Sequence, residues 1–99
     1  MATDDEQGPP VVVPIEDAID LHPFAPAEIP SVVESYLEAA SEAGFGEVRL
    51  IHGRGRGIQR ARVHQVLSRH PLVVSYRDAT PERGGFGATV VSLRQRGSV

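Results

Sequence analysis

One short segment, IHGRGRG at residues 51–57, combines residue types that bind phosphate with one that transfers protons. Its two arginines can each bind phosphate through several donors, and its three glycines allow the backbone to approach a ligand closely. Its histidine, His52, can act as an acid or a base near neutral pH. The segment is thus compatible with a phosphate-binding loop, a dinucleotide-binding loop or a catalytic histidine surrounded by positive charge. The candidate phosphate-binding residues here and in the helix that follows are Gly53, Arg54, Gly55, Arg56, Gly57 and Arg60.

A second histidine, His22, ends an earlier apolar segment, with Asp20 two residues before it. On a strand this spacing puts both side chains on one face, where a carboxylate can fix the tautomer of an imidazole and stabilise its charged form. Neighbouring strands of a sheet lie about 5 Å apart. If the strands that end at His22 and His52 are neighbours, these two histidines and Asp20 form one catalytic site.

A divalent ion such as Mg²⁺ or Mn²⁺ is an open alternative at this site. Asp20 and the two histidines could supply ligands to one ion. The sequence offers no second carboxylate beside them, so we assign catalytic roles to these side chains and no metal ligands.

The dinucleotide interpretation rests on the glycine pattern and on Asp78, which follows about twenty residues later, as an acidic residue does in the Rossmann fingerprint. The spacing here is G-x-G-x-G rather than G-x-G-x-x-G. The chain also lacks a second mononucleotide-binding half. The sequence therefore favours phosphate binding over dinucleotide binding.

With 99 residues, the chain is long enough for one small domain with one core. The absence of cysteine excludes thiolate zinc sites, disulfides and thiol nucleophiles. The absence of lysine excludes Schiff-base chemistry and the lysine-dependent phosphate loop, and all ten basic residues are arginine. This bias suits phosphate or nucleic-acid recognition, although a GC-rich genome would produce it as well.

The net charge of −3 conceals a strong asymmetry along the chain. Residues 1–48 contain eleven acidic and no basic residues, whereas residues 49–99 contain ten arginines and two acidic residues, Asp78 and Glu82. The second half therefore suits a polyanionic partner. Helices with oppositely charged outer faces would give the same asymmetry, and the sequence leaves both interpretations open.

Residues 1–14 are acidic and contain prolines, and they are predicted to form a flexible arm before a domain at 15–95 and a short tail at 96–99. The apolar run VVVPI is too short and too interrupted for a signal peptide or a membrane span. We therefore expect a soluble, cytoplasmic protein with no membrane partner.

The elements that must position these side chains follow from hydrophobic periodicity, in the order strand, helix, strand, helix, strand, strand. A half-buried strand at 15–22 precedes an amphipathic helix that begins near Glu28, carries Pro30 in its first turn and ends at a Gly44 cap. The remaining elements are a strand at 47–51, a helix from Ile58 that ends before His70, a strand at 72–79, a glycine-rich turn at 81–87 and a strand at 88–94.

This order predicts an α/β fold, specifically an α+β two-layer sandwich with a mixed four-stranded sheet. Two right-handed crossovers in one direction place both helices on one face, and the last short turn reverses the final strand. Ligands of such sheets bind at the carboxyl ends of the parallel strands, where His22 and His52 would meet. His64 and His70 lack such neighbours and are expected at the surface and at a helix end.

Three motifs of the chain resemble the Smr (small MutS-related) domain family. They are IDLH at 19–22, HGRG at 52–55 and GGFGATVV at 84–91, in the family's order. The family's usual forms are L-D-x-H-G, H-G-x-G and a glycine-rich turn that leads into a threonine-valine strand. The resemblance runs from about Ile15 to Arg94 and implies a stand-alone single-domain form, with a fold similar to the carboxy-terminal domain of a bacterial translation initiation factor.

The resemblance also implies a nucleic-acid-binding endonuclease. Some family members are similar to DNA-nicking enzymes, and others to endonucleases that act on messenger RNA at stalled ribosomes. The implied partners are DNA or RNA, such as DNA-repair intermediates or ribosome-bound message. By position, Asp20 and His22 match the first motif, and His52, Gly53 and Gly55 match the second.

Two hypotheses of different classes follow. In the first, His22 and His52 share acid and base roles in phosphodiester cleavage, Asp20 orients an imidazole, and the arginines of the 51–57 segment neutralise the developing charge. In the second, the domain binds DNA or RNA without cleaving it. Pro23 favours the second hypothesis, because it replaces the glycine that usually follows the first histidine and removes a backbone donor.

Overall fold

The computed structural model describes residues 15–55 and 57–94. The expectations for the arm at 1–14, the tail at 96–99 and Arg56 lie outside the described residues. Neither helix among the described residues is long and apolar enough to cross a membrane. The helices and strands are β2 (Ala18–Asp20), α1 (Ile29–Glu42), β3 (Glu47–Ile51), α2 (Ile58–Leu67), β4 (Val73–Asp78) and β5 (Ala88–Leu93). Short 3₁₀ turns lie at η1 (Pro26–Glu28), η2 (Pro81–Arg83) and η3 (Gly85–Gly87).

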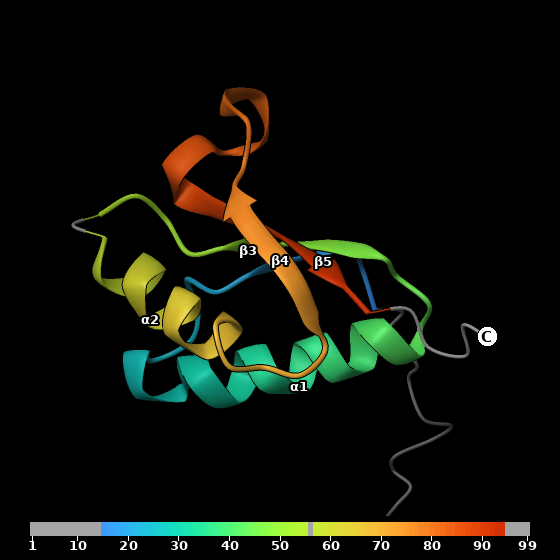
Figure 1. The fold of residues 1–99 in the computed structure, drawn as a ribbon. Helices are drawn as coiled ribbons and strands as arrows, with labels where there is room; N and C mark the ends of the chain where they lie inside the picture. Colours follow the sequence, from blue (N-terminus) through green and yellow to red (C-terminus); the bar gives the residue numbers. More distant parts are fainter. Residues whose placement is uncertain (1–14, 56, 95–99) are drawn as a thin grey trace, which may run out of the picture.

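The four strands form one mixed sheet in the order β2-β3-β5-β4. β2 pairs parallel with β3, while β5 runs antiparallel to both β3 and β4. Figure 1 shows both helices on one face of this sheet, which confirms the predicted two-layer α+β sandwich. The last strand of the chain thus lies between β3 and β4, in the interior of the sheet, and five of its six residues are buried.

α1 forms where apolar residues recur at helical spacing, and it buries one face against the sheet. Pro30 lies in its first turn, where a missing amide costs no helical hydrogen bond. After the helix, Gly44 adopts a left-handed conformation with φ of 92°, and the Phe45 amide donates to the Ala40 carbonyl. This geometry satisfies carbonyls at the helix end, so the predicted cap is confirmed.

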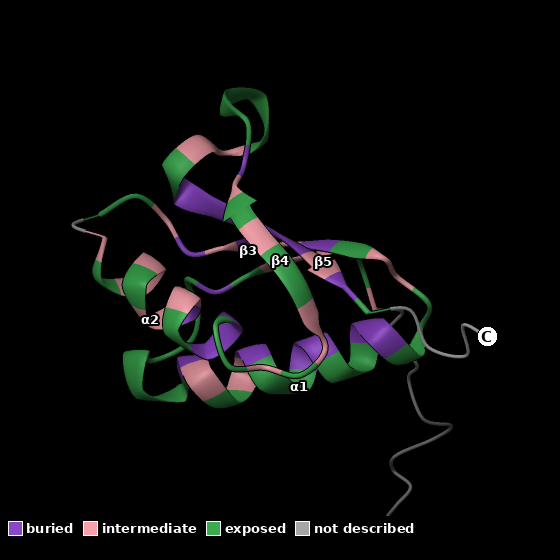
Figure 2. Ribbon diagram, in the orientation of Figure 1, coloured by how far each residue is buried: buried purple, intermediate pink, exposed green. Residues whose placement is uncertain are grey.

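The core lies between the helices and the sheet, as the buried segments in Figure 2 show. Val48, Leu50 and Val91 from the central strands belong to one buried cluster with Leu37 of α1 and Val63 of α2, and each is at most 1% exposed. Burial of one such side chain contributes about 1.5–3 kcal/mol. This packing fixes the sheet relative to α2, and therefore fixes both ends of the loop between β3 and α2.

The first strand is shorter than the predicted range 15–22, because β2 covers only Ala18–Asp20. The Asp20 carboxylate accepts a hydrogen bond from the His22 amide, and this local bond turns the chain away from the sheet. Pro23, which follows, has no amide to continue the pairing. The strand therefore ends where the candidate site begins.

Candidate functional site

The site lies at the edge of the sheet where β2 and β3 both end. These strands are parallel neighbours, with Asp20 opposite Ile51, and the Leu21 amide donates to the Ile51 carbonyl at 2.8 Å. The chain therefore leaves both strands at the same edge, one carrying His22 and the other His52. The expectation that these two strands are neighbours is confirmed.

Asp20 and His22 form an exposed hydrogen-bonded pair. The Asp20 Oδ1 atom lies 2.6 Å from His22 Nδ1 and accepts a second bond from the His22 amide at 2.9 Å. These bonds, the backbone bond first, hold the pKa of Asp20 below its usual value. A carboxylate can only accept, so Nδ1 carries the proton and leaves Nε2 as the acceptor of the neutral ring. The side chain of His22 is 60% exposed, so a substrate can reach this ring.

The His22 ring lies directly against the backbone of Gly53. A Cβ atom on Gly53 would stand 2.5 Å from His22 Nε2, closer than any side chain can approach. Gly53 also has a φ of 85°, in the left-handed region that residues with side chains rarely adopt. The backbone conformation therefore favours glycine here, and a side chain at this position would also displace the His22 ring.

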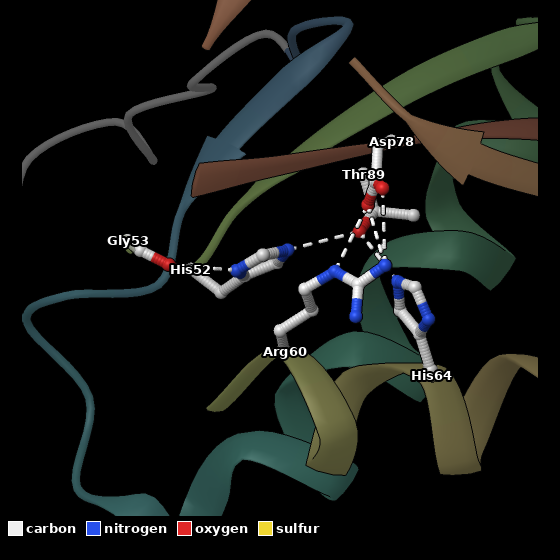
Figure 3. Close-up of polar contacts among 6 residues, drawn as sticks. All are labelled: His52, Gly53, Arg60, His64, Asp78 and Thr89. Carbon is white, nitrogen blue, oxygen red and sulfur yellow. Dashed lines mark hydrogen bonds and ion pairs between the residues drawn. The ribbon is translucent and has the colours of Figure 1, made fainter. Parts of the chain in front are cut away.

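His52 borders the same cavity but is directed into the protein, and it is only 5% exposed. Burial lowers the pKa of His52, which keeps the ring neutral. Its Nδ1–H donates to the Gly53 carbonyl at 3.0 Å, so its Nε2 accepts a hydrogen bond from the Thr89 hydroxyl at 2.9 Å. Both ring nitrogens are thus hydrogen-bonded within the protein (Figure 3).

His64 of α2 extends this arrangement. Its Nε2 lies 2.9 Å from the Thr89 hydroxyl oxygen and donates to it, since the hydroxyl hydrogen is directed to His52. Burial lowers the pKa of His64 as well. A chain of hydrogen bonds therefore runs from His64 through Thr89 and His52 to the Gly53 carbonyl (Figure 3). Contrary to the expected surface position, His64 is half-buried and packs edge-to-face on Tyr76.

A cavity of about 470 Å³ opens between the two strand ends and the start of α2, and we call it the strand-end cavity. His22 and Arg54 line this cavity, and the first turn of α2 borders it as well. The first amides of a helix have no helical partner and favour anions. The lining residues are His22, Pro26, His52, Gly53, Arg54, Gly55, Gly57, Ile58, Gln59 and Arg62.

Arg54 lies across the glycine-rich turn η3. A Cβ on Gly85 would meet the Arg54 guanidinium at 3.1 Å, and one on Gly87 would meet Arg54 Cγ at 3.3 Å. Within residues 15–55 and 57–94, no carboxylate pairs with this guanidinium. The glycines of η3 thus leave room for a cation beside the strand-end cavity.

Arg60, also predicted to bind phosphate, has a carboxylate partner within the fold. Its Nε and Nη2 atoms donate to the two oxygens of Asp78 at 2.9 and 3.0 Å (Figure 3). Its guanidinium carbon lies 5.1 Å from the ring centre of Phe86. Gly55 and Gly57 both line the strand-end cavity, whereas Arg56 lies outside the described residues.

The described residues do not supply a set of metal ligands. Among residues 15–55 and 57–94, no group of three histidine or carboxylate side chains converges closely enough to hold an ion. In particular, His52 uses its two nitrogens for Gly53 and Thr89. Asp20 and His22 therefore stand together without the second histidine that the metal alternative required.

The sequence interpretation missed Thr89 and His64, which hold His52 in place. The signal for His64 was its position three residues before Leu67, a buried residue on the same side of α2. For Thr89 the signal was a polar residue within an apolar strand, where a hydroxyl needs a partner. Neither signal indicates which partner the side chain meets.

Comparison with known proteins gives a family match over most of the chain. The model of the Smr domain family matches residues 19–94. Endonuclease MutS2 of Clostridium tetani is 41% identical over 80 residues, which are 81% of this chain and 10% of that protein. Endonuclease MutS2 of Halalkalibacterium halodurans is 50% identical over 62 residues, which are 63% of this chain and 8% of that protein. The chain thus spans about a tenth of the length of these relatives.

Two solved structures share the fold. The Smr domain of Thermus thermophilus MutS2 is 39% identical, with a TM-score of 0.76, over 80% of this chain and 99% of that one. YdaL of Escherichia coli, a stand-alone small MutS-related protein, is 32% identical with a TM-score of 0.76, over 83% of this chain and 67% of that one. The family match by sequence and the similarity of the fold therefore both relate this chain to Smr domains.

Proposed function

This chain belongs to the Smr domain family, and on that premise we propose that it is a nucleic-acid-binding endonuclease domain in which Asp20 and His22 carry the acid–base chemistry. The relatives named as endonucleases match this chain over only 8–10% of their own length, so the activity is a proposal for this domain itself. The observation that carries the proposal is the exposed Asp20–His22 pair in the strand-end cavity, next to Arg54. Such a pair supplies a base where a phosphate can bind.

In the proposed reaction, His22 Nε2 takes the proton from the attacking oxygen, which is a 2′-hydroxyl in RNA or a water molecule in DNA. The new P–O bond forms as the bond to the leaving oxygen breaks, and that oxygen takes a proton from solvent through the open cavity. Asp20 stabilises the imidazolium that forms on His22. The first amides of α2 and the Arg54 guanidinium stabilise the charge that builds on the phosphate oxygens.

His52 takes a positioning role in this proposal rather than sharing proton transfer with His22. Its Nε2 already accepts a hydrogen bond from Thr89, and its Nδ1–H is used by the Gly53 carbonyl. Because burial lowers its pKa, His52 remains neutral and has no spare proton for a leaving group. It acts through Gly53, whose backbone lies against the His22 ring.

The second candidate is a domain that binds DNA or RNA without cutting it, with a site impaired by Pro23. The geometry gives this alternative less support. The amide that binds Asp20 belongs to His22, not to residue 23, so the pair forms although Pro23 has no amide. The two candidates differ in turnover, which an assay can measure directly.

The test incubates the purified chain with single-stranded RNA, supercoiled DNA and duplex oligonucleotides, with and without a chelator. We expect cleavage of at least one substrate and a rate about 10²–10⁴-fold lower for His22→Ala, the usual contribution of a general base. His70→Ala is the matched control, because the His70 ring accepts from the Leu72 amide in the turn before β4. Binding without cleavage would favour the second candidate, and equal cleavage by His22→Ala would refute the role of His22.

A further inference from the structure

Phe86 is an exposed aromatic residue at the centre of η3. It is 63% exposed, whereas the buried aromatic Tyr36 is 7% exposed. The turn that carries it lies in the orange segment between β4 and β5, which extends beyond the end of the sheet in Figure 1. Phe86 belongs to neither buried cluster of the described residues, so packing within the fold does not account for it.

The ring of Phe86 is held in place by a cation on one face. The Arg60 guanidinium carbon stands 5.1 Å from the ring centre, within the range of a cation–π contact. Asp78 in turn fixes this guanidinium through two hydrogen bonds. The ring is therefore oriented before any ligand arrives, which lowers the entropy cost of binding on it.

Phe86 and Arg60 border a second hollow, of about 250 Å³, which we call the Phe86 hollow. Arg54, Gly55 and Gly57 line both this hollow and the strand-end cavity, so the two adjoin across the loop before α2. A ligand bound along this loop would thus present one part to His22 and another to Phe86. Arg54 stands between them, in reach of a phosphate that links the two parts.

We propose that Phe86, backed by Arg60, is a stacking site for an unpaired nucleobase of the strand whose phosphate occupies the strand-end cavity. This inference rests on the proposed function and narrows its substrate class. Every base has a flat π-face that can stack on an aromatic ring, and guanidinium groups add to such contacts. Inside a duplex both faces of a base are covered by its neighbours, so only single-stranded or locally unpaired nucleic acid can use the site.

The chain contains no tryptophan, so Phe86→Trp would place one fluorescent indole at the proposed site. The probes are oligothymidylate and oligouridylate of about 12 nucleotides, within the span of a single-strand-binding groove, and a fully paired hairpin of similar charge. His22→Ala in every variant keeps the strands intact. We expect quenching of the indole by the single strands and little quenching by the hairpin. Val74→Trp is the matched control and should stay unquenched, because Val74 is equally exposed at 63% but lies near the far end of β4.

Affinity provides a second measurement. Phe86→Leu keeps an apolar side chain but loses the ring, and it should weaken binding of the single strands roughly 5- to 150-fold. Phe86→Tyr should bind like the parent. Equal affinity of the leucine variant, or equal quenching by the hairpin, would overturn the stacking inference while the proposed function stands. If the parent bound no nucleic acid at all, both proposals would be overturned.

Discussion

The His22 imidazole rests on the backbone of Gly53, with Nε2 only 2.5 Å from the point where a Cβ on Gly53 would stand. This contact links the two strand ends, because His22 follows β2 and Gly53 follows β3. Through the Gly53 carbonyl it also links the exposed histidine to His52 and Thr89. The position of the proposed base thus depends on a residue without a side chain.

Replacement of Gly53 by alanine should therefore displace His22 and lower cleavage. Gly44→Ala is the matched control, because Gly44 has a similar φ of 92° with no atom within 4 Å of its added Cβ, against 85° at Gly53, and it lies after α1, outside the strand-end cavity. Both variants should lose about 1 kcal/mol of stability from backbone strain. Only Gly53→Ala should lose most of its cleavage rate, measured on the substrate that the parent cuts. Equal losses in both variants would show that backbone strain, not contact with His22, matters.

Asp20→Asn should reduce cleavage while the fold stays intact. An amide can bind His22 Nδ1 but carries no charge to stabilise an imidazolium, and it can favour the wrong tautomer. We expect a rate lower by about 10- to 100-fold, the range found for groups that orient functional histidines. Single-turnover cleavage and a thermal melt measure the two effects separately. An unchanged rate would mean that the 2.6 Å bond between Asp20 and His22 is not used in the reaction.

Thr89→Val should destabilise the fold, because it removes the hydroxyl to which both His52 and His64 are hydrogen-bonded. Valine has nearly the same shape as threonine, but it leaves the Nε2 atoms of His52 and His64 without their shared partner. We expect a loss of about 2–3 kcal/mol in the free energy of unfolding, measured by denaturant titration. Thr80→Val is the control, because Thr80 is exposed and should change stability by less than about 0.5 kcal/mol. Similar losses at both positions would contradict the hydrogen-bond chain.

Stability should also fall in mild acid. The pKa values of His52 and His64 lie below the usual 6.5, chiefly because burial disfavours their charged forms, and the nearby Arg60 adds to this effect while Asp78 opposes it. Below pH 6.5 the unfolded chain takes up protons that the folded protein does not, so stability is lost as the pH falls from 6.5 toward the lowered values. Unfolding midpoints at a series of pH values measure this loss. This loss of stability should be smaller in the His64→Gln variant, which lacks one of the two histidines. If the variant lost as much stability as the parent over the same pH range, His64 would not contribute.

The fold was largely predictable from local patterns. Strand 47–51 has the predicted bounds, and the Gly44 cap and the start of α2 at Ile58 follow directly from glycine positions and apolar spacing. The first strand was predicted too long, because its alternation continues after the Asp20 carboxylate has already bonded to the His22 amide. Hydrogen bonds of this kind, from a side chain to the nearby backbone, compete with strand pairing, and the pattern of apolar residues does not reveal them.

The candidate site, too, was predictable only in part. Asp20 and His22 are only two residues apart in the chain, so sequence spacing was sufficient to predict their proximity. The difference in exposure between His22 and His52 was not predictable, since both follow strands that end at the same edge. Only the fold shows that one ring is exposed and the other is 5% exposed, with both nitrogens bonded.

The sequence by itself determined the order of the elements, the pairing of Asp20 with His22 and the family to which the chain belongs, because each depends on residues close together or on motifs in order. The tertiary structure alone decided that β5 lies between β3 and β4, which brings Thr89 opposite Leu50 and within reach of His52 and His64. It also paired Arg60 with Asp78 and set Phe86 beside them. These contacts join residues far apart in the chain. They form because the sheet packs against α2, and no local sequence pattern indicates which residues this packing brings together.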